Sequence, residues 1–171
     1  KMKRQDGVLE VKLHTNDGPL HWSLLPHGEL ERAFYEIGHD PENEIMILTG
    51  SGEVFSGPPC PPNGHNHVSQ PVTAMEWDKI YFEGKHLLLN LLNIEVPIIA
   101  AINGTAAGVG ASIALACDFR VMSENSGLLY AFINIGLGPD GGASWLLARQ
   151  VGYSRALQIA VEGEKIKGEE C

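Results

Sequence analysis

The sequence is poor in three features that would assign it to a class directly: paired cysteines, basic residues and long apolar runs. Its 171 residues contain three cysteines, Cys60, Cys117 and Cys171, which are scattered and odd in number. They predict neither a disulfide framework nor a zinc site. Lysine and arginine total 12 against 21 acidic residues, so the formal net charge is −9. Because such a surplus repels phosphate groups, we expect no nucleic-acid partner and no binding to anionic membranes.

The longest apolar run, Val96 to Ile102, contains Pro97 and is far too short to cross a bilayer. The amino-terminal residues also lack the pattern of a secretory signal. Together with unpaired cysteines, which are typical of a reducing compartment, these features predict a cytoplasmic protein.

The first part of the chain follows alternating and helical spacings. Residues 9–13 alternate apolar and polar side chains, which predicts a strand with one buried face. Asn16-Asp17-Gly18 predicts a turn that leads into a returning strand at 20–22 and so forms a hairpin. Ser23 is placed to cap a helix that ends at Gly38. The apolar run 45–48 predicts an internal strand covered on both faces.

The second part begins with a loop at 56–71, because five of the ten prolines lie there. A helix is expected over 77–91, with Gly84 marking a close packing contact. Its aromatic residues Trp77, Tyr81 and Phe82 are expected in the core; alternatively, they line an acyl pocket. The further expected elements are a strand at 98–102, a buried helix from Gly108 or Val109 to 116, a strand at 119–122, a helix at 143–151 and a last helix capped by Ser154. This alternation predicts a single α/β domain.

A polar segment in the proline-rich loop, His65-Asn66-His67 near Cys60, lacks further ligands at metal-binding spacing, so no metal site is expected. The glycine-rich run that follows residue 102 is more informative. A strand ends there and a helix begins near Val109, with its first N–H groups unpaired. Such groups can hold an anion or an oxygen that gains charge during a reaction. Alternatively, Gly104, Gly108 and Gly110 only allow the helix to pack closely on the sheet.

Three separated segments carry a family resemblance: IMILTGSGEVFSG, VPIIAAINGTAAGVGASIALACDFRV and INIGLGPDGGASWLLARQVGYSRALQI. In this order they resemble the crotonase superfamily of enoyl-CoA hydratases and isomerases. The resemblance implies an α/β fold, a crotonase-like spiral of ββα units, over residues 1–171 as a single core domain whose C-terminal helical part is missing. It also implies an acyl-CoA thioester substrate, no cofactor apart from the coenzyme A of that substrate, and a homotrimer or hexamer.

The resemblance assigns roles to particular residues. Two backbone N–H groups stabilise an enolate oxygen in the family, and one of them falls on Val109, between Gly108 and Gly110. The second should follow Phe55-Ser56-Gly57, where the family pattern is FSAGAD and this chain has Pro58 and Pro59. Proline has no N–H, so either Gly57 or Cys60 supplies the second donor or half of the oxyanion hole is missing.

The acid–base residues differ from the hydratase pattern as well. Its two glutamates fall on Ser112 and Phe132, which disfavours simple hydration. Asp140 occupies the position of the catalytic aspartate in dienoyl-CoA isomerase-like and dehalogenase-like members, so proton transfer by Asp140 is expected. Alternatively, Asp140 only caps the helix that follows it.

A narrower resemblance joins MEWDKIYFEGKHLLLNLLNIEVPIIAAING and VKLHTNDGPLHWSL to the oxocamphor-hydrolase branch, which cleaves β-diketones without coenzyme A. The catalytic positions of that branch fall on Val109, Phe132 and Gly141, and none carries its side chain. Isomerase-like proton transfer on a thioester is therefore the leading hypothesis. The alternatives are a β-diketone hydrolase and an inactive family member.

Overall fold

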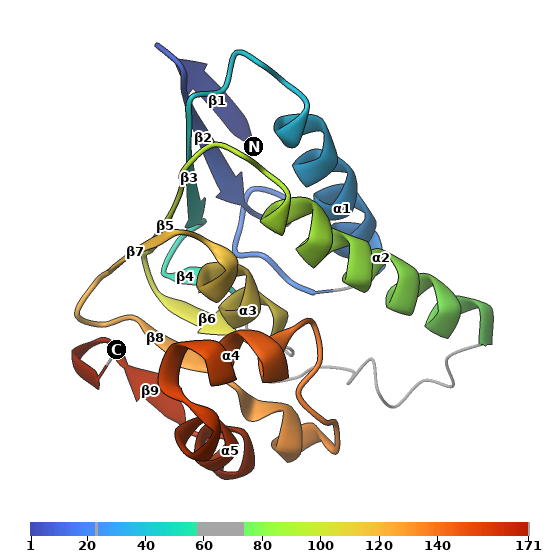
Figure 1. Ribbon diagram of the computed structural model, residues 1–171, viewed down its shortest axis with the longest axis vertical. Coiled ribbons are helices and arrows are strands. Elements are labelled where there is room, and N and C mark those ends of the chain that lie inside the picture. Colours follow the sequence, from blue (N-terminus) through green and yellow to red (C-terminus); the bar gives the residue numbers. More distant parts are fainter. Residues whose placement is uncertain (23, 58–73, 171) are drawn as a thin grey trace.

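The computed structural model describes residues 1–22, 24–57 and 74–170, and its elements repeat the order strand, strand, helix (Figure 1). The first three units are β1 (Met2–Gln5), β2 (Val8–Leu13) and α1 (Leu24–Gly38); β3 (Ile45–Gly50), β4 (Val54–Ser56) and α2 (Ala74–Leu92); and β5 (Ile98–Ile102), β6 (Thr105–Ala107) and α3 (Val109–Ala116). The rest of the described chain comprises β7 (Phe119–Met122), β8 (Gly127–Leu129), the 3-10 helix η2 (Ala131–Ile135), α4 (Ala143–Val151), α5 (Tyr153–Glu162), β9 (Lys165–Lys167) and the 3-10 helix η3 (Gly168–Glu170).

The strands form two sheets, and most repeating units contribute one strand to each sheet. The larger sheet has the order β1-β2-β3-β5-β7, and the smaller has the order β4-β6-β8-β9. From the second unit onward, the first strand of each unit joins the larger sheet and the second joins the smaller one. Parallel neighbours need a crossover, so each unit advances the chain by one strand in both sheets. The predicted spiral of ββα units is confirmed.

One part of the hydrophobic core lies where α1 and α2 cover one face of the larger sheet (Figure 1), and the core continues through α3 to α4 and α5. Phe34 of α1 and Leu87 of α2 are fully buried, as are Met46 and Leu48 of β3. The expectation that β3 is covered on both faces is wrong, because Ile45 is exposed and Ile47 only half-buried among the described residues. None of the helices described is both long and apolar enough to cross a membrane.

The turn at 16–18 is confirmed, but the hairpin expected from it is wrong. Asn16 and Asp17 have positive φ angles of 50° and 65°, and Thr15 bridges Gly18. Residues 20–22 form no strand, because both edges of β2 are occupied: β3 pairs with it in parallel, and β1 pairs with it antiparallel. The hairpin turn is Asp6-Gly7, with φ angles of 50° and 79°.

The helix expected over 77–91 is confirmed as α2, but two expectations about its surface are wrong. A Cβ on Gly84 would meet no described atom within 4 Å, so this glycine marks no close contact. Tyr81 and Phe82 are 73% and 60% exposed, so they lie outside the core of the described chain. The side chain of Trp77, the Ser23 cap and most of the proline-rich loop, including His65 and His67, lie outside the described residues.

Candidate active site at the start of α3

The start of α3 presents a backbone N–H that makes no hydrogen bond to another described residue. Gly108 precedes the helix with φ 55° and ψ −121°, and its own N–H donates to the Leu129 carbonyl over 2.9 Å. The Ser112 N–H donates back to the Gly108 carbonyl over 3.2 Å, which closes the first helical turn. The Val109 N–H has no partner in residues 1–22, 24–57 or 74–170. Among the described residues this N–H is therefore an unpaired donor, as expected for the first turn of a helix.

Gly110 has a packing role that the sequence left open. A Cβ at this position would overlap the Ser56 hydroxyl of β4, so only glycine lets α3 approach that strand. Ser56 is fully buried, and its Oγ accepts a hydrogen bond from the Ala107 N–H (3.2 Å) and donates one to the Ala107 carbonyl (3.5 Å). Ser56 thus fixes the end of β6 from which Gly108 and α3 begin.

The Gly57 N–H is already engaged. It donates to the Leu20 carbonyl over 2.7 Å, and a Cβ on Gly57 would overlap the same oxygen. This N–H is therefore not available to a substrate oxygen in this structure. Cys60, the other expected donor, lies outside the described residues together with Pro58 and Pro59.

The loop before α4 brings Asp140 next to the start of α3. Gly141 has φ 52°, and a Cβ on it would lie 2.9 Å from Cγ2 of Val109. The ring of Phe132, which is buried, lies 3.6 Å from the position that a Cβ on Gly108 would take. The fold thus brings Val109, Phe132 and Gly141 together, with Asp140 directly beside them. Ser112 is fully buried within α3, and its Oγ has no hydrogen-bond partner among the described residues.

Asp140 is not the cap of α4, so the structural alternative for this residue is wrong. The N-cap is Gly142, with φ 75° and no side-chain hydrogen bond, and the Asp140 carbonyl accepts the Ala143 N–H over 2.8 Å. The Asp140 side chain is exposed, yet the protein around its carboxyl removes part of its hydration and raises its pKa. The nearby His27 imidazole opposes that rise, and so does the hydrogen bond to the Asp140 backbone.

His27 and Trp22 belong to the surroundings of Asp140, although neither is a sequence-level candidate. His27 lies in the first turns of α1, and its ring centroid is 4.9 Å from that of Trp22. The Trp22 indole Nε1 is buried with no hydrogen-bond partner in the described chain. A Cβ on Gly28 would lie 3.0 Å from Oε1 of Glu83, so α2 packs closely against α1 one residue after His27. More than a hundred residues separate His27 from Asp140, so no spacing rule connects them.

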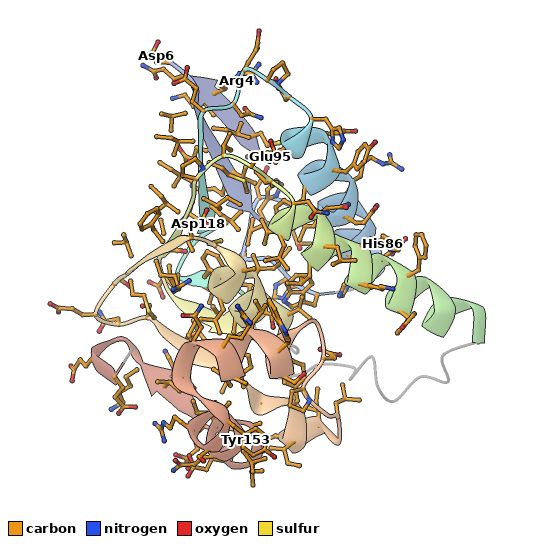
Figure 2. All side chains as sticks on the ribbon, viewed as in Figure 1. Arg4, Asp6, His86, Glu95, Asp118 and Tyr153 are labelled. Atoms are coloured by element: carbon orange, nitrogen blue, oxygen red, sulfur yellow. The ribbon has the colours of Figure 1, made fainter. Side chains whose placement is uncertain are left out.

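One other acidic residue, Asp118, has a structural role (labelled in Figure 2). Its carboxylate accepts a hydrogen bond from the Ile98 N–H over 2.8 Å, which ties the end of α3 to the start of β5. Within the described ranges, no group of three or more His, Cys, Asp or Glu side chains could hold a metal ion.

Comparisons with known proteins agree on one family. The family model described as enoyl-CoA hydratase/isomerase matches residues 3–171. A probable enoyl-CoA hydratase of Rhodobacter capsulatus is 38% identical over 131 residues, which cover 76% of this chain and 49% of that protein. The 1,2-epoxyphenylacetyl-CoA isomerase of Escherichia coli is 30% identical over 173 residues, covering 98% of this chain and 63% of that one.

A solved structure extends the comparison to a different reaction. A β-diketone hydrolase from the cyanobacterium Anabaena, bound to (S)-3-oxocyclohexyl acetic acid, has a TM-score of 0.86 and 35% identity, covering 99% of this chain and 66% of that one. The chain therefore spans between about half and two thirds of the length of these relatives. The match over nearly the whole chain confirms the crotonase-like α/β fold.

Proposed function

The chain belongs to the enoyl-CoA hydratase/isomerase family, and on this basis we propose that the protein binds an acyl-CoA thioester, stabilises its enolate and shifts a proton through Asp140. The observation that carries the proposal is the unpaired Val109 N–H at the start of α3, next to the Asp140 loop. The two groups of this mechanism, the Val109 N–H and the Asp140 carboxyl, need no metal and no resident cofactor. Coenzyme A enters the site as part of the substrate.

In the proposed mechanism, the thioester oxygen accepts a hydrogen bond from the Val109 N–H. When Asp140 removes a proton next to the carbonyl, the electron pair of the C–H bond delocalises onto that oxygen. One oriented donor of this kind contributes about 3–4 kcal/mol to stabilisation of the charged state. Asp140 then returns the proton to another carbon, which moves the double bond. A raised pKa suits this exchange, since the group must both accept and donate the proton.

Simple hydration fits the residues less well. Addition of water requires one group to activate the water and another to protonate the carbon chain. The two positions that resemble the hydratase glutamates hold Ser112, which is fully buried, and Phe132, whose ring cannot transfer a proton. We therefore propose isomerisation rather than hydration. A homotrimeric or hexameric state and a cytoplasmic location also remain proposals, which the family resemblance supports.

Hydrolysis of a β-diketone is a second candidate, favoured by the 35% identity to the Anabaena enzyme and by the pairing of Trp22 with His27 beside Asp140. Cleavage of a carbon–carbon bond needs a base that activates water and a donor that protonates the departing carbon. His27 and Asp140 could divide these roles. The positions expected for this chemistry, Val109, Phe132 and Gly141, lack ionisable side chains, so we rank this function second.

The deciding experiment is calorimetry of the full-length protein with a panel of acyl-CoAs and cyclic β-diketones, followed by turnover assays of Asp140→Asn. We expect binding of a thioester and a fall in kcat of about 10²–10⁴-fold in the variant. The control is Asp6→Asn, which makes the same chemical change in an exposed turn far from the site (Figure 2) and should leave kcat within about twofold.

Each alternative gives a different result. Binding of diketones without any thioester would replace the leading proposal with the second candidate. Unchanged turnover in Asp140→Asn would remove Asp140 from the mechanism. Binding of neither class would leave the inactive family member as the best description.

A further inference from the structure

We propose that the Val109 side chain positions the loop that carries Asp140, so that Val109 serves the site twice, through its N–H and through its isopropyl group. The inference rests on the proposed function and deepens it. The N–H at position 109 does not depend on the side chain, so the isopropyl group of Val109 has a separate role to explain.

The Val109 isopropyl group fills the space that a side chain on Gly141 would need. A Cβ on Gly141 would lie 2.9 Å from Cγ2, 3.4 Å from Cγ1 and 3.5 Å from Cβ of Val109. The Val109 side chain therefore lies on the side of Gly141 from which a Cβ would project. Val109 is itself half-buried and packs against the hydrophobic core, so it is a fixed support.

The loop needs such a support because its own backbone is permissive. Gly141 and Gly142 are consecutive glycines with φ angles of 52° and 75°. Glycine adopts these positive φ angles freely, but it adopts many other backbone conformations just as easily. Gly142 is flanked by α2 and α4, since a Cβ on it would lie 3.8 Å from Leu88 and 3.5 Å from Leu146. Val109 supplies the contact from α3, one residue from Asp140.

This arrangement links the two chemical groups of the proposed reaction. The Val109 N–H meets the substrate oxygen, while the Val109 side chain fixes the residue next to the proton carrier. A rotation of α3 that moved one would move the other. Glycine at position 109 would keep the N–H and lose this link, so Val109 acts as a positioning residue for Asp140.

The test compares Val109→Ala, Gly141→Ala and the double variant Val109→Ala/Gly141→Ala. Loss of the two γ-methyl groups in Val109→Ala should lower kcat about tenfold and leave KM within about twofold, because misplacement of a reacting group acts on the chemical step. Gly141→Ala should lower kcat about a hundredfold, since its new Cβ meets the Val109 methyl groups. The double variant should recover about tenfold of that loss, because both γ-methyl groups are then absent.

Gly136→Ala is the matched control for the backbone. Gly136 has φ 74°, and a Cβ on it would meet no described atom within 4 Å. This variant carries the same left-handed strain without the clash, so its kcat should stay within about twofold of the wild type. If Gly136→Ala loses as much activity as Gly141→Ala, backbone strain alone explains the effect and the proposal fails.

A readout without substrate separates this inference from the proposed function. Relaxation dispersion of the Asp140 and Gly141 amides should show new μs–ms exchange in Val109→Ala and none in Gly136→Ala. Unchanged dispersion in Val109→Ala, a rise in KM at constant kcat, or a double variant no better than Gly141→Ala would each overturn the inference. A wild-type protein that turns over no thioester would overturn the proposed function, while the dispersion result would still decide whether Val109 holds the loop.

Discussion

Two buried serines offer a matched test of how the start of α3 is held in place. Ser56 and Ser112 are both fully buried, and Ser→Ala removes the same hydroxyl from each. The Ser56 Oγ makes two contacts with Ala107, whereas the Ser112 Oγ has no partner among the described residues. The same substitution should therefore destabilise the protein at position 56 and not at position 112.

The magnitude follows from the hydrogen bonds that are lost. In Ser56→Ala the buried Ala107 N–H loses the acceptor at 3.2 Å, and leaving a buried donor unpaired costs about 1–3 kcal/mol. The contact with the Ala107 carbonyl, at 3.5 Å, is too long to add much. A loss of about 2 kcal/mol corresponds to a fall in Tm of about 4–8 °C for a chain of this size. Ser112→Ala removes a buried hydroxyl that has no partner in residues 1–22, 24–57 and 74–170, so stability should stay the same or rise.

The assay is unfolding of both variants by urea and by heat, monitored by circular dichroism. An m-value equal to that of the wild type would support the two-state analysis. Ser56→Ala should unfold at lower urea concentration than the wild type, and Ser112→Ala should not. Equal losses in the two variants would refute the reasoning, because they would show that loss of volume rather than loss of a hydrogen bond sets the cost.

Two further predictions concern ionisable groups. Because the pKa of Asp140 is raised in the folded state, its carboxyl favours folding in the protonated form and opposes it once ionised, so Asp140→Asn should raise Tm near neutral pH. That gain should shrink as the pH falls toward the ordinary value of 3.8, and a gain that is constant across pH would contradict the sign. Burial raises the pKa of Cys117 to about 12, so this thiol should resist iodoacetamide at about pH 8 in the folded protein and react after unfolding in urea. Peptide mapping would show whether Cys117 carries the label. Rapid labelling of Cys117 in the native protein would contradict its burial.

Local chemistry could be predicted from the sequence where one short segment decides the outcome. The alternation at 9–13 and the helical spacing of α2 are properties of those residues alone, and both elements are confirmed. The predicted hairpin at 16–18 is wrong because Asp6-Gly7 and the turn at 16–18 have the same local preference for positive φ. Which turn joins two strands depends on which edge of β2 is free, and β3 decides that from more than thirty residues away.

The candidate site depends on distant contacts even more strongly. The sequence alone could not separate a packing glycine from a glycine at a donor site, because both occur where a helix begins. The contact with Ser56, 54 positions before Gly110 in the sequence, identifies Gly110 as a packing residue, and the positive φ of Gly108 gives that glycine its own role. The exposure of Tyr81 and Phe82 likewise depends on what covers α2 and not on their spacing.

The contrast between backbone and side-chain groups explains why we propose isomerisation rather than hydration for this site. An N–H at position 109 survives any substitution except proline, so the stabilisation of an enolate can persist while the surrounding side chains change. Proton transfer has no such protection, because Ser112 and Phe132 cannot replace two carboxylates. When such side chains are replaced, a reaction that needs two separate proton-transfer groups is more easily abolished than a reaction that needs one. In the proposed mechanism Asp140, which precedes the Gly141 that lies next to Val109, meets the smaller requirement, since the same carboxyl can take a proton from one carbon and return it to another.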